Sequence, residues 1–247
     1  MKVTKKRIVI TGGTSGIGYE MVKLLHSENE VIVIARNAMK LNKLELELPG
    51  VVTYQADLSQ ATEVEAAANK ILERFKSLDI LINNVAVQYT PTFLDDDFQY
   101  SNIADEVALN FTNICHMTYW LLPALMKNEK SHERTIILNI NSGLGFVPKT
   151  SSAVYCATKA ALDIFSQSLS YQLEQTNVRV QQAFLELVDT PMTAGRGTNK
   201  MSPKLAAQKI IYGIENDISI NNIGKVKLLR VLLRLVPSIA KRIMKKY

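Results

Sequence analysis

The chain has 247 residues, of which 47% are hydrophobic and 21% charged, a composition typical of a globular protein with a full core and unlike that of a disordered or fibrous chain. Its formal net charge is +6, but residues 218–247 contribute +8 and contain no acidic residue, which leaves −2 on the remainder. The positive charge therefore lies at the end of the chain. The remainder is slightly acidic, which argues against nucleic-acid binding by residues 1–217.

The beginning and the cysteine content of the chain indicate its compartment. Residues 1–7 are basic but lead directly into a strand pattern rather than into the apolar core of a signal peptide. No apolar run reaches the roughly 18 residues that cross a bilayer. The two cysteines, Cys115 and Cys156, and the three scattered histidines lack the spacing of a metal site or a disulfide framework. We therefore expect a cytoplasmic protein with no bound metal.

Short β-branched runs alternate with longer amphipathic segments along the chain. Strands are predicted at residues 7–11, 31–35, 51–55, 79–83, 135–140 and 178–184. Helices are predicted at residues 18–26, 38–48, 61–75, 108–126 and 153–175. Most of the strand runs are apolar throughout, as in parallel strands that are covered on both faces. This order predicts an α/β fold in three layers, with a doubly wound parallel sheet between two layers of helices.

No internal repeat, low-complexity stretch or Pro/Gly linker divides the sequence. We therefore expect residues 1–247 to form a single domain. The polar, glycine-containing segment 191–203 follows the sixth predicted strand. Ligands of doubly wound sheets bind beyond the carboxyl ends of the strands, so this segment is in position to act as a substrate lid. Residues 225–247 form a basic amphipathic tail.

A glycine-rich turn, TGGTSGIG at residues 11–18, lies between the first predicted strand and the first predicted helix. Glycines let the backbone approach a pyrophosphate closely, and the N–H groups at the start of the helix bind it. The candidate phosphate contacts are Gly12, Thr14, Ser15, Gly16, Ile17 and Gly18. Such a turn alone could be only a tight turn, but its place between a strand and a helix predicts a Rossmann-type dinucleotide site.

The second predicted strand ends in Ile34-Ala35-Arg36, with no acidic residue at its tip. An acid at this place is typical of NAD binding, whereas an arginine accommodates the 2′-phosphate of NADP. Arg36 therefore favours NADP(H) over NAD(H) as the cofactor. The alternative is a solvated surface arginine, and NAD(H) then remains an option.

The glycine turn followed by Tyr155-x-x-x-Lys159 resembles the classical short-chain dehydrogenases and reductases, and the resemblance extends over most of the chain. It implies a catalytic set of Asn110, Ser142, Tyr155 and Lys159. It also implies that further cofactor contacts come from Asp57 and Leu58 at the adenine, from Asn83, and from Val188 and Thr190 at the carboxamide. Residues 139–146, 154–161 and 188–190 are similar to the DltE-like branch of bacterial oxidoreductases.

The chemistry of these residue types agrees with the resemblance. A free tyrosine has a pKa of about 10 and is a poor acid or base at neutral pH. Lys159 lies one helical turn from Tyr155, so we expect its charge to lower the pKa of the phenol. Ser142 would bind the substrate oxygen, Tyr155 would transfer the proton, and Asn110 would hold a water that links Lys159 to solvent. The prediction is an NADPH-dependent oxidoreductase acting on a carbonyl/alcohol pair.

Three departures from the family pattern keep a second hypothesis open, a catalytically silent nucleotide-binding scaffold or sensor. Asn83-Asn84-Val85-Ala86 replaces Asn-Asn-Ala-Gly, and Asn113 replaces a glycine. Leu185-Glu186 replaces Pro-Gly after the sixth strand. Glu186 would either place a carboxylate beside the nicotinamide or point into solvent.

The substrate pocket is expected to be mainly apolar. Its expected lining is Gln88, Leu144, Phe146, Phe184, Leu187 and the 191–203 segment, with Arg196 and Lys200 near the mouth. A medium-sized carbonyl compound or its alcohol fits this lining, and an acidic group on it is an option.

The tail carries a basic stripe of Lys227, Arg230 and Arg234 on an otherwise apolar helix pattern. Such a helix could lie on an anionic membrane surface. It could also pack on its own core or across a subunit interface, and we favour packing because it explains most amphipathic helices. The family resemblance implies a homodimer or homotetramer, with a small-molecule substrate and no nucleic acid.

Overall fold

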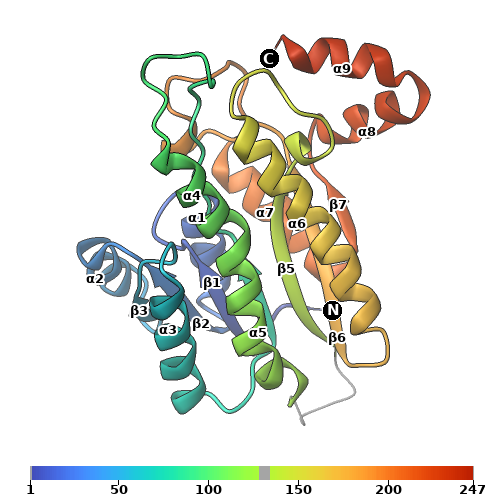
Figure 1. The fold of residues 1–247 in the computed structure, drawn as a ribbon. Coiled ribbons are helices and arrows are strands. Elements are labelled where there is room, and N and C mark those ends of the chain that lie inside the picture. Colours follow the sequence, from blue (N-terminus) through green and yellow to red (C-terminus); the bar gives the residue numbers. More distant parts are fainter. Residues whose placement is uncertain (1, 128–133, 247) are drawn as a thin grey trace.

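The computed structural model describes residues 2–127 and 134–246, and its centre is a parallel sheet (Figure 1). The strands are β1 Arg7–Thr11, β2 Glu30–Ala35, β3 Val52–Gln55, β4 Ile80–Asn83, β5 Thr135–Ser142, β6 Val178–Leu185 and β7 Ile220–Asn222. They form one seven-stranded sheet in the order β3-β2-β1-β4-β5-β6-β7, and every pairing is parallel. The predicted doubly wound α/β fold is confirmed.

Helices cover both faces of the sheet (Figure 1). The α-helices are α1 Gly16–Leu25, α2 Ala38–Glu47, α3 Ala61–Arg74, α4 Ser101–Val107, α5 Asn113–Met126, α6 Ala153–Gln172, α7 Pro203–Glu215, α8 Val226–Leu235 and α9 Pro237–Lys245. Side chains of α1, α2 and α7 pack on one face of the sheet, and side chains of α3, α5 and α6 pack on the other. The result is the expected three layers.

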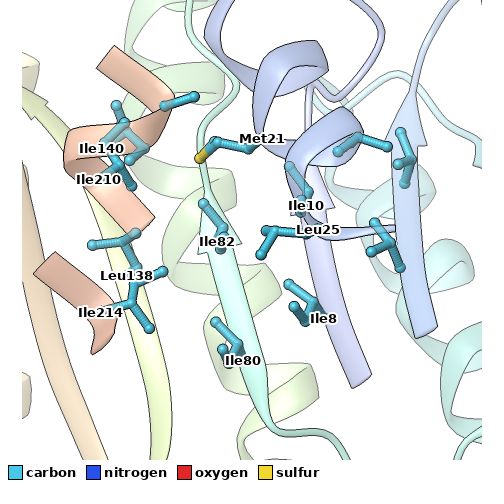
Figure 2. Close-up of a cluster of buried hydrophobic side chains, with 14 of the residues drawn as sticks. Ile8, Ile10, Met21, Leu25, Ile80, Ile82, Leu138, Ile140, Ile210 and Ile214 are labelled. Carbon is cyan, nitrogen blue, oxygen red and sulfur yellow. The ribbon is translucent and has the colours of Figure 1, made fainter. Parts of the chain in front are cut away.

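The alternation of side chains along each strand divides the apolar residues between two cores. Ile8 and Ile10 of β1 enter the core under α1 and α7, whereas Val9 between them enters the core under α3 and α5. Figure 2 shows the first of these cores, in which Met21 of α1 and Ile210 of α7 reach toward the strands. Burial on both faces explains why the strand sequences are apolar throughout.

The structure differs from the predicted elements at three places. The helix predicted at 108–126 is α5 preceded by a π-helical turn, η1 Ala108–Thr112, and by α4. Strand β7 was not predicted, because its residues are polar or half-exposed at the edge of the sheet. Helix α7 was not predicted either, although Ser202 accepts a hydrogen bond from the backbone N–H of Leu205 and caps its start.

The strand order sets the position of the site. The chain moves outward from β1 through β2 to β3, then returns to β4 on the other side of β1. A crevice forms where the order reverses, beyond the carboxyl ends of β1 and β4. The glycine turn after β1 lies there, as do the residues that follow β4, β5 and β6.

Pro237 divides the tail into two helices, α8 and α9, that lie beyond the carboxyl ends of the strands, at the top of Figure 1. Proline at the first position of α9 has no N–H to continue α8. Tyr247, the last residue of the predicted tail, lies outside the described residues. Among residues 2–127 and 134–246, every helix is too short or too polar to span a bilayer.

Candidate active site

A cavity of about 700 Å³ opens beyond the carboxyl ends of the central strands. Its walls come from the glycine turn, the segment after β4, the start of α6, the segment after β6, and the tail. Its lining includes Gly12, Ser15, Gly16, Ile17, Asn84, Gln88, Ser142, Lys149, Tyr155, Lys159, Glu186, Val188, Thr190, Arg196, Leu229 and Leu232. The structure therefore brings the glycine turn together with the predicted catalytic residues Ser142, Tyr155 and Lys159.

The glycine turn forms a narrow cradle. Gly12 has φ +70°, a conformation that side chains other than glycine rarely adopt. A Cβ on Gly18 would lie 2.3 Å from the carbonyl oxygen of Gly12, so no other residue fits there. Ser15 makes no side-chain capping hydrogen bond, and the first N–H groups of α1 are therefore open to an anion. These features fit the pyrophosphate of a dinucleotide.

Asn84 holds this cradle from the neighbouring strand. Its Nδ2 donates to the carbonyl oxygen of Thr11 at 2.9 Å and to that of Gly12 at 3.3 Å. Asn83, which was expected at the cofactor, does not line the cavity. Strand alternation turns it toward α5, where its Nδ2 lies 3.4 Å from Oγ1 of Thr118. The same Nδ2 donates to Oδ1 of Asn139 on β5 at 2.8 Å. The expected polar contact after β4 thus comes from Asn84.

Arg36 and Asp57 meet at the outer end of the crevice, outside the cavity. Nη1 of Arg36 lies 3.7 Å from Oδ2 of Asp57, and the Arg36 side chain is 79% exposed. Partial burial raises the pKa of Asp57, but hydrogen bonds from Ser59 and the charge of Arg36 outweigh it and hold the pKa below its ordinary value. The guanidinium is thus held beside Asp57 and is still accessible to a ligand.

Leu58 is buried next to Asp57 and is bound by Asn113, the residue that replaces a glycine of the family pattern. Nδ2 of Asn113 donates to the carbonyl oxygen of Leu58 at 2.9 Å. The asparagine that replaces the expected glycine therefore fixes the segment after β3 against α5.

Ser142, Tyr155 and Lys159 form one wall of the cavity. Ser142 ends β5, and its hydroxyl accepts from the backbone N–H of Leu144 at 3.2 Å and is hydrogen-bonded to Tyr155. Tyr155 and Lys159 lie on one face of α6, with the Lys159 Nζ 5.7 Å from the centre of the Tyr155 ring. The Nζ donates to the carbonyl oxygen of Ile140 at 2.9 Å.

Burial controls the proton affinities of this wall. It raises the pKa of Tyr155 to about 12, against the opposing effects of the Ser142 hydrogen bond and the Arg196 charge. It lowers the pKa of Lys159 to about 8. The expected lowering of the Tyr155 pKa is therefore not met, because burial of the phenol is the largest effect and raises the pKa. Tyr155 is protonated at neutral pH.

Asn110 lies in the π-helical turn and is completely buried. Its Oδ1 accepts from the backbone N–H of Val87 and its Nδ2 donates to the Val87 carbonyl oxygen, both at 2.8 Å. The Nδ2 also lies 3.4 Å from Oγ1 of Thr158 on α6. The Asn110 amide therefore clamps the segment after β4 to the helix that carries Tyr155.

The segment after β6 closes over the cavity. Val188 and Thr190 line it as expected, and Val188 pairs with Met201. Nη1 of Arg196 donates to Oε1 of Gln88 at 2.8 Å and so spans to the opposite wall. Lys200, also expected near the mouth, instead binds the Thr193 carbonyl oxygen and the Asp189 carboxylate.

Glu186 lines the cavity and is bound to the start of the tail. Its Oε2 accepts from the backbone N–H of Lys225 at 3.2 Å, at the start of α8. Gly224 has φ +66°, and a Cβ there would lie 2.2 Å from Oε1 of Glu186. The carboxylate thus sits against the N-terminus of α8, where a negative charge is favourable. The residue that replaces the family's glycine anchors the tail.

The tail forms a roof over the cavity, which the sequence analysis did not foresee. The apolar side chains it contributes are those of Val226, Leu228, Leu229, Leu232, Ile243 and Met244. Oγ1 of Thr150 donates to the Lys245 carbonyl oxygen at 2.6 Å, which fixes the far end of α9. The inner face of the tail therefore faces the cavity, and Val226 of α8 and Ala240 of α9 are buried.

Phe146 and Phe184, expected in the pocket, lie outside it. Their rings stack with centres 4.1 Å apart, and Phe184 is completely buried. The guanidinium of Arg230 lies 4.3 Å from the centre of the Phe146 ring. The two rings therefore support the roof from the side.

Comparison with known proteins agrees with this geometry. A family model described as short chain dehydrogenase matches residues 6–201. The uncharacterized oxidoreductase DltE of Bacillus subtilis is 37% identical over 191 residues, which cover 77% of this chain and 74% of that protein. An uncharacterized oxidoreductase of Staphylococcus epidermidis is 30% identical over 227 residues, covering 89% of this chain and 95% of its own.

Solved structures share the fold at lower sequence identity. A short chain dehydrogenase from Burkholderia cenocepacia in complex with NADP superimposes with a TM-score of 0.87 at 21% identity, over 99% of both chains. The 3-ketoacyl-(acyl-carrier-protein) reductase of Brucella melitensis, complexed with NADH, has a TM-score of 0.81 at 23% identity, over 90% of this chain and 98% of that one.

Proposed function

Since this chain belongs to the short-chain dehydrogenase family, we propose that it is an NADPH-dependent oxidoreductase that interconverts a carbonyl compound and its alcohol. One observation carries the proposal. Ser142, Tyr155 and Lys159 line the same cavity as a glycine cradle built for a pyrophosphate.

The cofactor would be held along the crevice by residues from both halves of the sheet. Gly12, Ser15 and Ile17 would hold the pyrophosphate, and Val188 and Thr190 would hold the carboxamide end. A bound nicotinamide dinucleotide would supply or accept the hydride.

Ser142 and Tyr155 would bind and protonate the substrate oxygen. The Ser142 hydroxyl is hydrogen-bonded to Tyr155, so both hydroxyls can reach one oxygen atom. Since the pKa of Tyr155 is raised to about 12, the phenol carries a proton at neutral pH and suits the role of acid in carbonyl reduction. Lys159 would supply positive charge beside it once the phenol has given up its proton.

Asn110 acts in this proposal as a positioning residue. Its amide joins Val87 to Thr158, and so fixes the distance between the segment after β4 and the helix that bears Tyr155. The Asn110 amide is already bound to Val87 and Thr158. A water that links Lys159 to solvent would therefore need hydrogen bonds from neighbouring backbone groups in addition to any from Asn110.

Arg36 supports the preference for NADPH. Its side chain is exposed at the tip of β2, and its guanidinium can bind a 2′-phosphate with two hydrogen bonds. Asp57 next to it keeps the side chain in place.

The test is a fluorescence titration of the protein with NADPH and NADH in parallel. We expect NADPH to bind at least about tenfold more tightly, the usual effect of one charge-assisted contact. Arg36→Gln should remove the preference and leave NADH affinity unchanged. Equal affinities in the unchanged protein would overturn the NADPH assignment, and failure to bind either dinucleotide would favour the silent scaffold.

We further propose that the enzyme is a cytoplasmic homodimer or homotetramer. The outer faces of α5 and α6 expose large side chains, with Tyr119 71%, Ile164 66% and Tyr171 73% exposed, and exposed apolar patches commonly mark subunit contacts. Light scattering should report a dimer or tetramer, and Ile164→Glu should shift it toward the monomer. A monomer at micromolar concentration would contradict this proposal.

We also propose that the outer face of the tail contacts an anionic membrane surface. Val231, Leu235 and Ile239 are 52%, 72% and 52% exposed, although the inner face of the tail is packed. Residues 218–247 carry eight basic and no acidic side chains, so this surface is complementary to anionic lipid.

Vesicles of phosphatidylglycerol provide the test by co-sedimentation. Binding should fall with added salt and be lost in the double variant Val231→Glu, Leu235→Glu. The control Leu46→Glu, at a site 84% exposed on α2, should bind normally. No co-sedimentation at low salt would exclude the membrane contact.

A further inference from the structure

Lys149 and Arg196 face the cavity beside the catalytic wall, and from them we infer that the substrate carries a carboxylate. The site would thus take an acidic, largely aliphatic carbonyl compound, with the carboxylate bound between the two cations. This inference rests on the proposed oxidoreductase function and specifies its substrate class.

The two cations reach the cavity from opposite sides. Lys149 lies between β5 and α6, and Arg196 lies on the segment after β6; both line the cavity together with Ser142 and Tyr155. Arg196 is held in place, since its Nη1 donates to Oε1 of Gln88 at 2.8 Å. Its other guanidinium N–H groups can still donate to a ligand.

Both cations are partly buried, and their charges repel each other. Partial burial lowers the pKa of Lys149, and the charge of Arg196 lowers it further. Partial burial also lowers the pKa of Arg196. An anion bound between two neighbouring, partly buried positive charges would offset their repulsion.

No acidic side chain compensates these charges within the described part of the chain, where neither residue forms an ion pair. Glu186 lines the cavity, but its carboxylate accepts from the backbone N–H of Lys225. Glu106, whose charge acts on Tyr155, is 2% exposed. Its carboxylate accepts from the backbone N–H groups of Tyr89 and Tyr155 and is therefore already used. An incoming carboxylate would supply the missing charge.

The position of the pair distinguishes it from a cofactor phosphate site. Arg196 contacts Gln88 and interacts electrostatically with Tyr155, whereas the phosphate cradle is formed by Gly12 and the start of α1. The anion would therefore lie on the substrate side of the proton donor.

The roof defines the remainder of the substrate. Leu229, Leu232 and Met244 cover the cavity with apolar surface, which favours an aliphatic chain over a sugar or a nucleotide. An aliphatic oxo acid satisfies both the cations and the roof.

The experiment measures binding and turnover separately. The protein, saturated with NADP⁺, is titrated calorimetrically with levulinate and its longer oxo-acid homologues, and in parallel with their methyl esters. We expect at least one acid to bind about tenfold more tightly than its ester, as for one charge-assisted contact. Arg196→Gln and Lys149→Gln should each reduce this ratio severalfold, whereas the control Lys204→Gln, an exposed lysine on α7, should leave it unchanged.

Three results would overturn the inference: acids and esters that bind equally, no binding of any acid, or a ratio that survives both substitutions. A fall in NADP⁺ affinity with an unchanged ratio would assign the cations to the cofactor and likewise overturn it. Turnover with NADPH decides the proposed function independently, since reduction of esters and acids at equal rates would support the oxidoreductase and reject the acidic substrate.

Discussion

The two ends of the cavity are built in different ways. The cofactor end is assembled from consecutive residues, the turn after β1, with Asn84 of the adjacent strand as its support. The substrate end is assembled from segments far apart in the chain, where Gln88 meets Arg196 and Glu186 meets Lys225. The first end can be recognised from a short motif, whereas the second exists only in the folded chain.

The two ends also differ in how well they should tolerate substitutions. A Cβ at Gly18 would strike backbone, and backbone cannot move without disturbing β1. The roof is held by a few contacts at its ends and a layer of apolar side chains. Substitutions at the cofactor end should therefore abolish binding, and those at the substrate end should alter selectivity.

The largest effect is expected at the wall that both ends share. Tyr155→Phe removes the proton donor and keeps the ring, so kcat should fall about 10³-fold while NADPH affinity stays unchanged. Stopped-flow measurement of NADPH oxidation together with fluorescence titration would check both values. Residual activity near that of the unchanged enzyme would show that another group donates the proton.

A similarly specific loss is expected at the cofactor end. Gly18→Ala places a Cβ 2.3 Å from the Gly12 carbonyl oxygen, and the resulting displacement of the cradle should weaken NADPH binding about 10²-fold. In the control Gly50→Ala the added Cβ meets nothing within 4 Å, although Gly50, unlike Gly18, has a positive φ of +93°. This substitution should cost about 1–2 kcal/mol of stability and leave NADPH affinity unchanged. Equal effects of both variants on affinity would contradict the cradle.

A smaller effect is expected at the substrate end. Glu186→Gln removes the charge at the N-terminus of α8, which should cost about 1 kcal/mol locally and speed amide exchange in α8 about fivefold. Hydrogen exchange would measure it, with Glu28→Gln on the surface as the control. NADPH affinity should change less than in Gly18→Ala, because glutamine has the size and shape of glutamate and leaves the cradle after β1 in place. Unaltered exchange would show that apolar packing alone holds the roof.

A further effect concerns the dependence of stability on pH. Lys159 has a pKa of about 8 in the folded protein against an ordinary 10.5, so between these values the unfolded chain binds more protons. Stability should therefore rise with pH across this window. Below it the destabilisation by the buried ammonium is complete and no longer depends on pH. Denaturant unfolding of the unchanged protein and of Lys159→Met at pH 8 and pH 10 would reveal the difference. Parallel curves for the two proteins would contradict the shift.

The sequence was most informative where function depends on neighbouring residues. It located the strands of the central sheet, the glycine turn, and Ser142, Tyr155 and Lys159, and the predicted similarity to DltE was confirmed. Each of these features follows from local periodicity or short spacing. Asn84 rather than the predicted Asn83 lines the cavity. Neighbouring strand residues point to opposite faces, and the motif alone does not say which face borders the cavity.

What the sequence determined by itself is therefore the doubly wound fold, the phosphate-binding turn and the catalytic helix. Only the tertiary structure showed that Glu186 binds the start of α8, that the tail covers the cavity, and that Lys149 and Arg196 both line it and form no ion pair among the described residues. It also reversed the expected pKa shift of Tyr155, because desolvation depends on everything packed around the phenol. Local spacing encodes the elements, but burial and long-range contact arise only when distant segments meet.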